Sequence, residues 1–578
     1  MATLDVVKPE DLYVRRAVAS FWRDRFRWLL LFGIAVVVLY PIGTLIYSSF
    51  LATEPGGGSF RAKSMSLEPW RDAFGDGYVL DSLLTTFRVV IPKVAFAVGL
   101  ATFFAWTIGR TNTPGRSKFE AAIFFMWFTP TLPVILSWIV LLAPRAGLLN
   151  KWMEPILPFG FRFNAYSYES LVFFGGIYVA PILFIFLLPA FRNMDASLEE
   201  SAQMSGATLW HRARHITIPL MLPAILTVTA LVIVLSLESF ELEALLGIPA
   251  GIFVFTTRIF DLLFLQNFAE FGTASALALV LMMITLTLII FQRRILAKRE
   301  FTTITGKGYR PKQMDLGKWR WVTFSILLGY VLIFGLFPIV MLIVNSFMVV
   351  SGFIGPAYFT MDNWIRALTE PNLLRALRNT LVLGFSTATI GVVLVSVSSY
   401  VVIKTKDRWR GVAALDMVMW LPIAVPGMVL ALGMLWAYVR LPIYNTLWIL
   451  VLAFLIRGLP TGSRFFTTTM IQVGNELEES ARIHGASWLR TLRSILLPLL
   501  KPAVISAWIF LFVLSTRQLD SALLLSGPQT QVLSVTMFKA ATRGSFEVAS
   551  ALGLMQTILV FSIYLGLRFI GGRDRAQG

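Results

Sequence analysis

One polar element occurs twice in this chain and decides its fold class. Residues 477–503 read LEESARIHGASWLRTLRSILLPLLKPA, and residues 198–224 read LEESAQMSGATLWHRARHITIPLMLPA. Aligned without a gap, the two copies are identical at 13 of 27 positions, and they lie 279 residues apart, counted from 198 to 477. A long repeat of this kind predicts a chain of two similar halves, each carrying one copy of the element.

The residues around these elements have the composition of a membrane protein. Of the 578 residues, 57% are hydrophobic and only 14% are charged, and the mean hydropathy is +0.73. Soluble domains average about 45–50% apolar and about 25% charged residues. The net charge of +18 would suggest a nucleic-acid partner in a soluble protein. In a membrane protein, Lys and Arg accumulate in cytoplasmic loops, so we expect no nucleic-acid partner.

Twelve apolar segments are long enough to cross a bilayer of ~30 Å as helices that rise ~1.5 Å per residue. They fall near 28–50, 82–109, 119–143, 169–191, 217–245, 273–292, 320–346, 378–403, 412–436, 445–470, 499–525 and 548–570. Each should be helical, because backbone groups in lipid need partners within their own segment. The first segment follows a cluster of arginines and has no small-residue cleavage site, so it predicts an uncleaved span.

The predicted fold is an all-α polytopic membrane protein of two parallel six-helix repeats. We expect a cytoplasmic N-terminal segment at 1–27 and a first domain at 28–292. A basic cytoplasmic linker at 293–319 should join it to a second domain at 320–570, followed by a cytoplasmic tail at 571–578.

The basic residues predict how the chain is oriented. With a cytoplasmic N-terminus, the loop at 110–118, both copies of the repeated element, the linker and the loop at 404–410 are all cytoplasmic, and all are rich in Lys and Arg. This distribution obeys the positive-inside rule. Six spans separate the two copies, so both copies face the cytoplasm. The halves are then related by an axis along the membrane normal.

Each copy predicts a short amphipathic helix that ends in a tight turn. Gly206 and Gly485 stand where a helix can end with a positive-φ residue. Pro219 and Pro498 begin the next span, where the first helical turn tolerates proline. A single copy fits equally well a helix lying on the bilayer surface. Two copies with the same spacing favour docking to a partner that has two-fold symmetry.

The spacing of these residues resembles the EAA loop of ABC importer permeases. The matching residues are Glu199, Glu200, Ala202, Gly206 and Pro219 in the loop 198–219, and Glu478, Glu479, Ala481, Gly485 and Pro498 in the loop 477–498. Both copies depart from the pattern by having Ser at its second position, and the first also has Ile in place of Leu before the proline. The resemblance covers essentially the whole chain, as two fused permease domains. The segments SFELEALLGIPAGIFVFTTRIF (239–260) and LLLSGPQTQVLSVTMF (523–538) are similar to the fused iron(III)-type permeases.

This resemblance implies a subunit of an ATP-driven importer in a bacterial inner membrane. The implied partners are a cytoplasmic ATPase homodimer that docks on the two EAA loops, an extracytoplasmic substrate-binding protein, and membrane lipid. ATP and Mg would bind to the ATPase, because this chain contains no G-x4-G-K-[ST] motif and therefore no cofactor site of that kind. The implied substrate is iron(III), and thiamine, polyamines and phosphonates are the alternatives within the same class of transporter.

Ionisable residues near the ends of two equivalent spans form the candidate substrate pathway. They are Glu238, Glu241, Glu243, Arg517 and Asp520. Such residues within a membrane are costly and are functional candidates by default. Since the 279-residue offset relates Glu238 to Arg517, we expect Arg517 to bridge the halves beside an outer gate lined by Glu238 and Glu241. Four carboxylates and one arginine would form a negative ring, which favours cations. The alternative is a buried ion pair that only holds the halves together.

Two other classes of protein explain less of the sequence. Secondary transporters also contain six-plus-six parallel repeats, but they do not account for two EAA loops. A membrane enzyme is not supported, because the chain has no Cys, no HExxH motif, and three His residues that all lie in the repeated loops. We therefore predict no catalytic residue and no metal site.

Overall fold

The computed structural model describes residues 9–53, 62–156, 161–195, 197–297, 313–353, 358–405 and 409–572. Within these ranges the elements are helices, apart from a hairpin of β1 (Leu51–Thr53) and β2 (Ala62–Met65). Most of the predicted linker 293–319 and of the tail 571–578 lies outside the described residues.

The predicted all-α membrane fold is confirmed. Ten helical segments of the described chain are long and apolar enough to span a membrane. In the first half these are the Asp24–Ser48 part of α1 (Pro9–Ser48), α3 (Tyr78–Arg110), α7 (Tyr168–Arg192), Trp210–Leu237 ending in α10 (Ile218–Leu237), and Phe271–Gln292 in α12 (Phe271–Ala297). In the second half they are Trp319–Ser346 with α13 (Trp319–Tyr330) and α14 (Phe337–Ser346), α16 (Pro371–Lys404), α19 (Leu447–Gln472), Leu489–Arg517 ending in α22 (Leu497–Arg517), and Phe546–Gly566 in α25 (Phe546–Gly572).

Two spans that the sequence predicts as continuous, 119–143 and 412–436, are sharply bent. The first span divides into α4 (Arg116–Phe128) and α5 (Thr131–Leu142), which are bent by 94° relative to each other. The second span divides into the segment Val412–Ala424, which begins with α17 (Val412–Trp420), and the helix α18 (Gly427–Tyr438), with a bend of 110° between them. Thr129 and Val425, at the two breaks, both have extended backbones and precede Pro130 and Pro426. A residue before proline avoids the helical conformation. Hydropathy alone does not show the bends, because both arms of each span are apolar.

A third bent pair begins within the predicted span 217–245, because α10 ends at Leu237. The turns Glu243–Ala250 and the helix α11 (Phe255–Phe264) meet at 74° shortly after α10. Their counterparts in the second half are α23 (Asp520–Leu525) and α24 (Leu533–Thr542). These short helices bring polar residues back against the ends of the long spans.

The first span of each half packs against the other half. The hydroxyl of Thr44 in α1 donates a hydrogen bond of 2.9 Å to the carbonyl of Gly433 in α18. A Cβ at Gly433 would lie 2.4 Å from the carbonyl oxygen of Pro41, so glycine is needed for this close approach. Reciprocally, the hydroxyl of Ser137 in α5 donates to the carbonyl of Pro338 in α14 over 2.8 Å. This exchange of first spans joins the two repeats into one body.

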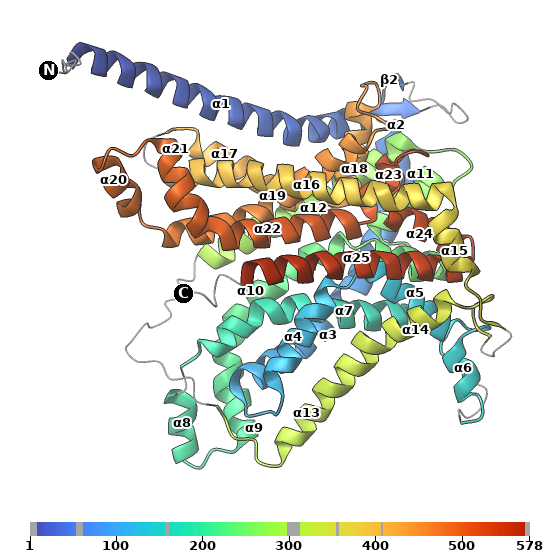
Figure 1. Cartoon of the computed structure of the whole chain (residues 1–578). Coiled ribbons are helices and arrows are strands. Elements are labelled where there is room, and N and C mark those ends of the chain that lie inside the picture. Colours follow the sequence, from blue (N-terminus) through green and yellow to red (C-terminus); the bar gives the residue numbers. More distant parts are fainter. Residues whose placement is uncertain are drawn as a thin grey trace.

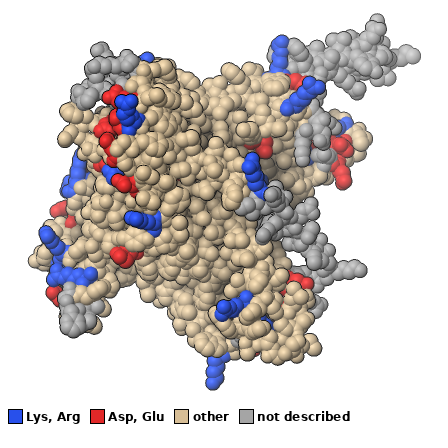
Figure 2. Space-filling view, turned by 180° about the vertical axis from the view of Figure 1, so that it is seen from behind, with Lys and Arg blue, Asp and Glu red and all other residues tan. Residues whose placement is uncertain are grey.

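The molecule has two chemically different ends and an apolar middle. Figure 1 shows α8 (Ser197–Met204) and α20 (Asn475–Ile483) at the left end, whereas α2 (Glu68–Gly75), α11, α15 (Asp362–Thr369) and α24 lie at the right end. In Figure 2 the charged atoms gather mostly around the rim of a broad uncharged surface. Exposed Phe32 on α1 and Val393 on α16 belong to the apolar side chains that a lipid bilayer would cover.

Candidate functional site

The two repeated loops fold in the same way. In the first, α8 is followed by Gly206, α9 (Leu209–Arg212) and a π-helical turn, Ala213–Thr217, that leads into α10. In the second, α20 is followed by Gly485, α21 (Trp488–Thr491) and a π-helical turn, Leu492–Leu496, that leads into α22. The prolines Pro219 and Pro498 occupy the first turns of α10 and α22. The predicted order of short helix, glycine turn and re-entry is therefore present in both copies.

The glycine turns have the geometry that ends a helix. Gly206 has φ +83° and Gly485 has φ +75°. The amide of the next residue reaches back to the helix in each case, so that the carbonyls of Ala202 and Ala481 each accept a hydrogen bond of 2.9 Å. This is the bonding pattern of a left-handed helix stop. An added Cβ would meet nothing within 4 Å at either glycine, so only the positive φ restricts these positions.

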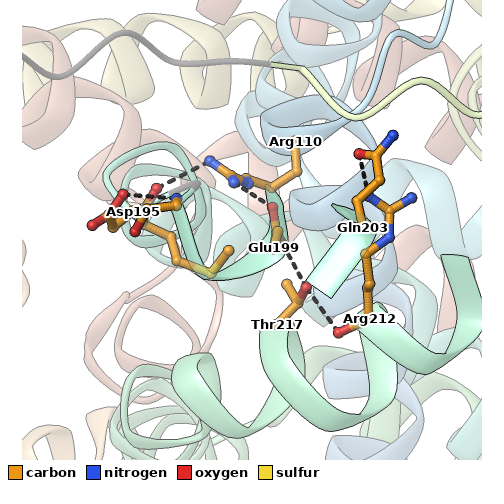
Figure 3. Close-up of polar contacts among 8 residues, drawn as sticks. Arg110, Asp195, Glu199, Gln203, Arg212 and Thr217 are labelled. Carbon is orange, nitrogen blue, oxygen red and sulfur yellow. Dashed lines mark hydrogen bonds and ion pairs between the residues drawn. The ribbon is translucent and has the colours of Figure 1, made fainter. Parts of the chain in front are cut away.

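A buried ion pair anchors the first loop to the membrane domain (Figure 3). Glu199 of α8 is only 4% exposed and pairs with the guanidinium of Arg110, the last residue of α3. The hydroxyl of Thr217 donates a 2.6 Å hydrogen bond to the other oxygen of Glu199. Arg110 also donates to the carbonyl of Met194, just before the loop, over 3.0 Å. One cation therefore holds both the entry to the loop and its helix.

The second loop is anchored in the same manner. Glu478 of α20 is 6% exposed and lies 3.0 Å from the ammonium of Lys404, the last residue of α16. Lys404 also donates to the carbonyl of Val473 over 3.1 Å. Val473 is the equivalent of Met194 at the 279-residue offset. The hydroxyl of Tyr400 donates to Glu478 over 3.2 Å, in place of a threonine. We call the pairs Arg110–Glu199 and Lys404–Glu478 the loop anchors.

Apolar side chains point away from the membrane domain on both loops. Met204 is 91% exposed and its equivalent Ile483 is 83% exposed. Three positions of each loop, related by the 279-residue offset, carry such side chains and form what we call the apolar triads: Leu198, Met204 and Trp210 in the first loop, and Leu477, Ile483 and Leu489 in the second. Exposed apolar clusters on a polar segment mark an interaction surface.

A cavity of about 300 Å³ lies between the halves, where the helices that leave the loops end. The charged residues that line it are Lys93, Glu238, Glu241, Arg457, Arg517 and Asp520. Glu238 directly follows α10, and Arg517 is the last residue of α22. Each loop is thus joined by one long helix to a charged residue of this cavity.

Arg457 of α19 is the central charge of the cavity. Its guanidinium lies 3.4 Å from a carboxylate oxygen of Glu238 in the first half and 3.7 Å from one of Asp520 in the second half. The other oxygen of Glu238 and the Nη1 atom of Arg457 are buried and have no hydrogen-bond partner among the described residues. Buried polar groups normally have partners, so this corner of the cavity has polar capacity for a ligand or water.

Family comparison identifies the class of this protein. The family of binding-protein-dependent transport system inner membrane components matches residues 85–300 and 401–573, and each matched region contains one of the two loops. The chain belongs to this family. It is a multi-pass inner-membrane permease component of a binding-protein-dependent ABC importer and not the catalytic subunit. The resemblance to fused ABC permeases is confirmed, and the secondary-transporter alternative is set aside.

The permease is similar to ferric transport permeases over most of its length. It is 25% identical over 555 residues to the ferric transport system permease protein FbpB of Actinobacillus pleuropneumoniae, covering 93% of this chain and 77% of that protein. It is 23% identical over 494 residues to the Fe(3+)-transport system permease protein FbpB 2 of Haemophilus influenzae, covering 83% and 87%. The spermidine/putrescine transport system permease protein PotC of Escherichia coli is 25% identical over 241 residues, covering 42% of this chain and 90% of PotC.

The predicted loop residues of the permease divide into inward and outward positions. Glu199 and Glu478 face the membrane domain in the loop anchors, whereas Glu200 is half-buried and Glu479 is exposed. The cations of the anchors were missing from the predicted site. A signal for them exists in the sequence, since a basic residue ends the second long span of each half, but these residues served only to orient the chain.

Glu238 pairs with Arg457 and not with its symmetry equivalent Arg517. Arg517 instead donates to the carbonyl of Trp127 over 2.8 Å. Residues related by a pseudo-two-fold axis lie at the same depth in the membrane. They lie on different sides of that axis, however, so two equivalent residues need not be in contact. The carboxylate of Glu241 accepts from the amide of Leu519 in the second half over 3.2 Å. Glu241 therefore does link the halves.

Glu243 does not line the cavity of the permease. Its carboxylate lies 2.8 Å from the ammonium of Lys93, accepts a 2.6 Å hydrogen bond from Ser239, and is fully buried. This is a structural ion pair within the first half, whereas the alternative expected from the sequence was a pair that joins the two halves. With Lys93 and Arg457 present, three cations rather than one face the four carboxylates, so the net formal charge of this group is −1 rather than the −3 of the predicted ring.

Proposed function

We propose that this permease forms the translocation pathway of an ATP-driven importer of iron(III). In this proposal, a cytoplasmic ATPase homodimer docks on the two EAA loops, and a substrate-binding protein delivers iron to the opposite face. The observation that carries the coupling role is the duplication of the whole loop architecture: the same anchor, the same glycine turn and the same apolar triad occur twice. A two-fold symmetric partner requires two such surfaces.

The connections of the loops suggest how motion is transmitted. ATP and Mg bind on the ATPase, and closure of the ATPase dimer moves α8 and α20. Each loop anchor ties its helix to the end of α3 or α16. Each loop also continues into α10 or α22, which end at Glu238 and Arg517 beside the cavity. A displacement of the loops is therefore carried along continuous helices of ~20 residues, or about 30 Å, to the cavity.

The cavity charges are suited to a gate between the halves. Arg457 attracts one carboxylate from each half, Glu238 and Asp520. Moving the halves apart separates Arg457 from Glu238 and leaves the carboxylate of Glu238 available to a cation. We propose that Glu238, Glu241 and Asp520 contact the substrate in the open state, with Arg517 fixing the wall through Trp127. Glu243 stabilises that wall through Lys93.

Iron(III) is the substrate that the relatives favour. The ferric permeases align with 83% to 93% of this chain, whereas the polyamine permease aligns with 42%. In proteoliposomes that contain the permease with its ATPase, we expect uptake of radiolabelled ferric iron that requires ATP and the cognate binding protein. Transport of spermidine or thiamine in place of iron would contradict the substrate. Iron uptake without ATP would contradict the whole proposal.

Valine at Gly206 and Gly485 should uncouple the transporter. Positive φ in a residue other than glycine costs roughly 1–2 kcal/mol, and a β-branched residue tolerates it least. The double variant Gly206→Val, Gly485→Val should therefore insert normally but lose more than about tenfold of its ATP-driven uptake, since 1.4 kcal/mol is a factor of ten. The measurements are uptake and co-purification of the ATPase.

Asparagine provides the matched control for these glycines. Asn enters the left-handed region more readily than other residues, and there is space for its side chain at both turns. The double variant Gly206→Asn, Gly485→Asn should keep most of the uptake. Equal activity of the valine and asparagine variants would show that positive φ at these turns is not needed for coupling.

A further inference from the structure

The end of the permease opposite the loops is built from equivalent elements in the two halves. In the first half, the amide of Phe255, which begins α11, donates to the hydroxyl of Thr86 in α3 over 3.0 Å. In the second half, the amide of Leu533, which begins α24, donates to the hydroxyl of Thr380 in α16 over 2.8 Å. This shared contact relates α3 to α16 at an offset of 294 residues and α11 to α24 at an offset of 278.

The second half has a basic concavity at this end. It has a volume of about 390 Å³, and the charged residues that line it are Arg366, Glu370, Arg375, Lys539 and Arg543. Arg366 and Glu370 lie 4.0 Å apart and are both solvent-exposed. In the described parts of the chain, Arg375, Lys539 and Arg543 form no ion pair. Burial and the neighbouring Arg543 lower the pKa of Lys539, which is the effect of cations that lack a counter-charge.

The equivalent positions in the first half carry acids. By these offsets, Asp72 is the first-half equivalent of Arg366, Asp81 is that of Arg375, and Asp261 is that of Lys539. Asp72, Asp76 and Asp261 lie close enough to Glu270 that, together with burial, they raise the pKa of its carboxyl group. Asp261 is buried and pairs with Arg258 over 2.8 Å, so the acids that this surface presents are Asp72, Asp76 and Asp81, beside Arg71, the single nearby exposed cation among the described residues. The two equivalent surfaces of one chain therefore still have opposite net charge.

We propose that the basic concavity receives an acidic surface of the substrate-binding protein, and that its acidic counterpart repels the same surface, so that the binding protein docks in one orientation. This rests on the proposed function, in which substrate is delivered at the end opposite the loops. A pseudo-two-fold permease otherwise offers two nearly equal docking orientations. Like charges across the wrong interface supply the repulsive element that specificity requires.

The placement of the charges favours a protein as the occupant over a lipid headgroup or free phosphate. A small anion would bind only the basic concavity, and the acidic surface of the first half would then have no role in its binding. A partner that covers both halves meets both surfaces at once. Because the two halves belong to one chain, each surface can carry its own charge, which a homodimeric permease cannot achieve.

The test measures binding of the purified binding protein to the permease–ATPase complex in lipid nanodiscs. The variant Lys539→Glu, Arg543→Glu should weaken binding by about tenfold or more at low salt, mainly through the association rate, with a smaller effect at high salt. The matched control is Arg145→Glu, Arg162→Glu, which makes the same charge change at exposed positions outside the concavity. The control should bind as the unaltered complex does.

A second variant tests the orientation itself. Asp72→Lys, Asp81→Lys gives the first half a basic surface like that of the second. Binding should be kept or become tighter, whereas ATP-driven uptake per bound molecule should fall by up to about twofold, because part of the binding protein now docks reversed. Full uptake with tighter binding would overturn the orientation claim.

The outcomes separate this inference from the proposed function. If the unaltered complex binds no binding protein, then the proposed function fails. If the unaltered complex and the variant Lys539→Glu, Arg543→Glu bind the binding protein equally well, then the basic concavity is not a docking surface, and the proposed function is unaffected. Nanodiscs of neutral phosphatidylcholine should give the same loss as nanodiscs that contain phosphatidylglycerol. A loss seen only with the anionic lipid would overturn the assignment to the binding protein.

Discussion

Methionine in place of Arg110 will leave the permease inserted but unable to couple ATP hydrolysis to transport. The change leaves Glu199 buried beside α3 without its cation. Removing one partner of a buried ion pair costs about 3–5 kcal/mol, which lowers the ratio of anchored to detached loops by roughly 10²-fold to 4 × 10³-fold. We expect a loss of uptake on the order of 100-fold, and a still larger loss when Lys404→Met is added. The measurement is ATP-driven uptake, with ATPase activity followed in parallel.

Two further variants make this prediction specific to the loop anchor. Arg192→Met removes a cation that pairs with Glu120 at the protein surface, and exposed pairs contribute only about 0–1 kcal/mol. This control should keep most of its uptake. The double variant Arg110→Met, Glu199→Leu removes both charges and should recover part of the stability, since apolar replacement of a whole buried pair is often neutral. Uptake that is normal in Arg110→Met would refute the anchoring role.

Leucine in place of Arg457 will disable the central cavity. It leaves Glu238 and Asp520, one from each half, without the cation that attracts both. The same cost of about 3–5 kcal/mol applies to an unpaired buried charge, so we expect a lower melting temperature and at least about 100-fold less uptake. Arg457→Lys keeps the charge but not the forked geometry, and it should retain the fold with reduced transport.

Removal of the carboxylates distinguishes a gate from a structural pair at Arg457. The triple variant Arg457→Leu, Glu238→Gln, Asp520→Asn has no unpaired charge in this corner, so its melting temperature should exceed that of Arg457→Leu. If the carboxylates contact the substrate, then the triple variant stays inactive although it is more stable. Recovery of uptake along with stability would show that these three residues only hold the halves together.

The loops were predictable from sequence because they depend on local rules. A positive-φ glycine, a proline in the first helical turn and the spacing of the acids are all visible within about 25 residues, and Gly206, Gly485, Pro219 and Pro498 occupy the conformations expected of them. The positions of the ten unbent spans follow from hydropathy in the same way. The exposure of Met204 and Ile483 also depends on local sequence, because each is an apolar residue within a short polar segment.

The cavity was less predictable because it depends on contacts between distant segments. Sequence symmetry relates Glu238 to Arg517, but the fold brings Glu238 to Arg457, which is 219 residues away on a different helix. The bends at Pro130 and Pro426 do not follow from hydropathy, because a straight and a bent apolar segment have the same hydropathy. The exchange of the first spans was also not foreseeable, because either half offers α1 an apolar surface.

The exchange of first spans has a consequence for the order of synthesis. Thr44 and its partner Gly433 are separated by 389 residues. At ~5–20 residues per second, the ribosome needs roughly 20–80 s between making the first span and making the helix on which it finally rests. During that interval α1 must remain in the lipid bilayer, because α18, against which it packs in the folded protein, has not yet been synthesised. Complete packing of the first span therefore depends on synthesis of the second half. A chain that stops after residue 292 can form the contact of Ser48 with Ser275 in α12, but not the contact of Thr44 with Gly433 in α18.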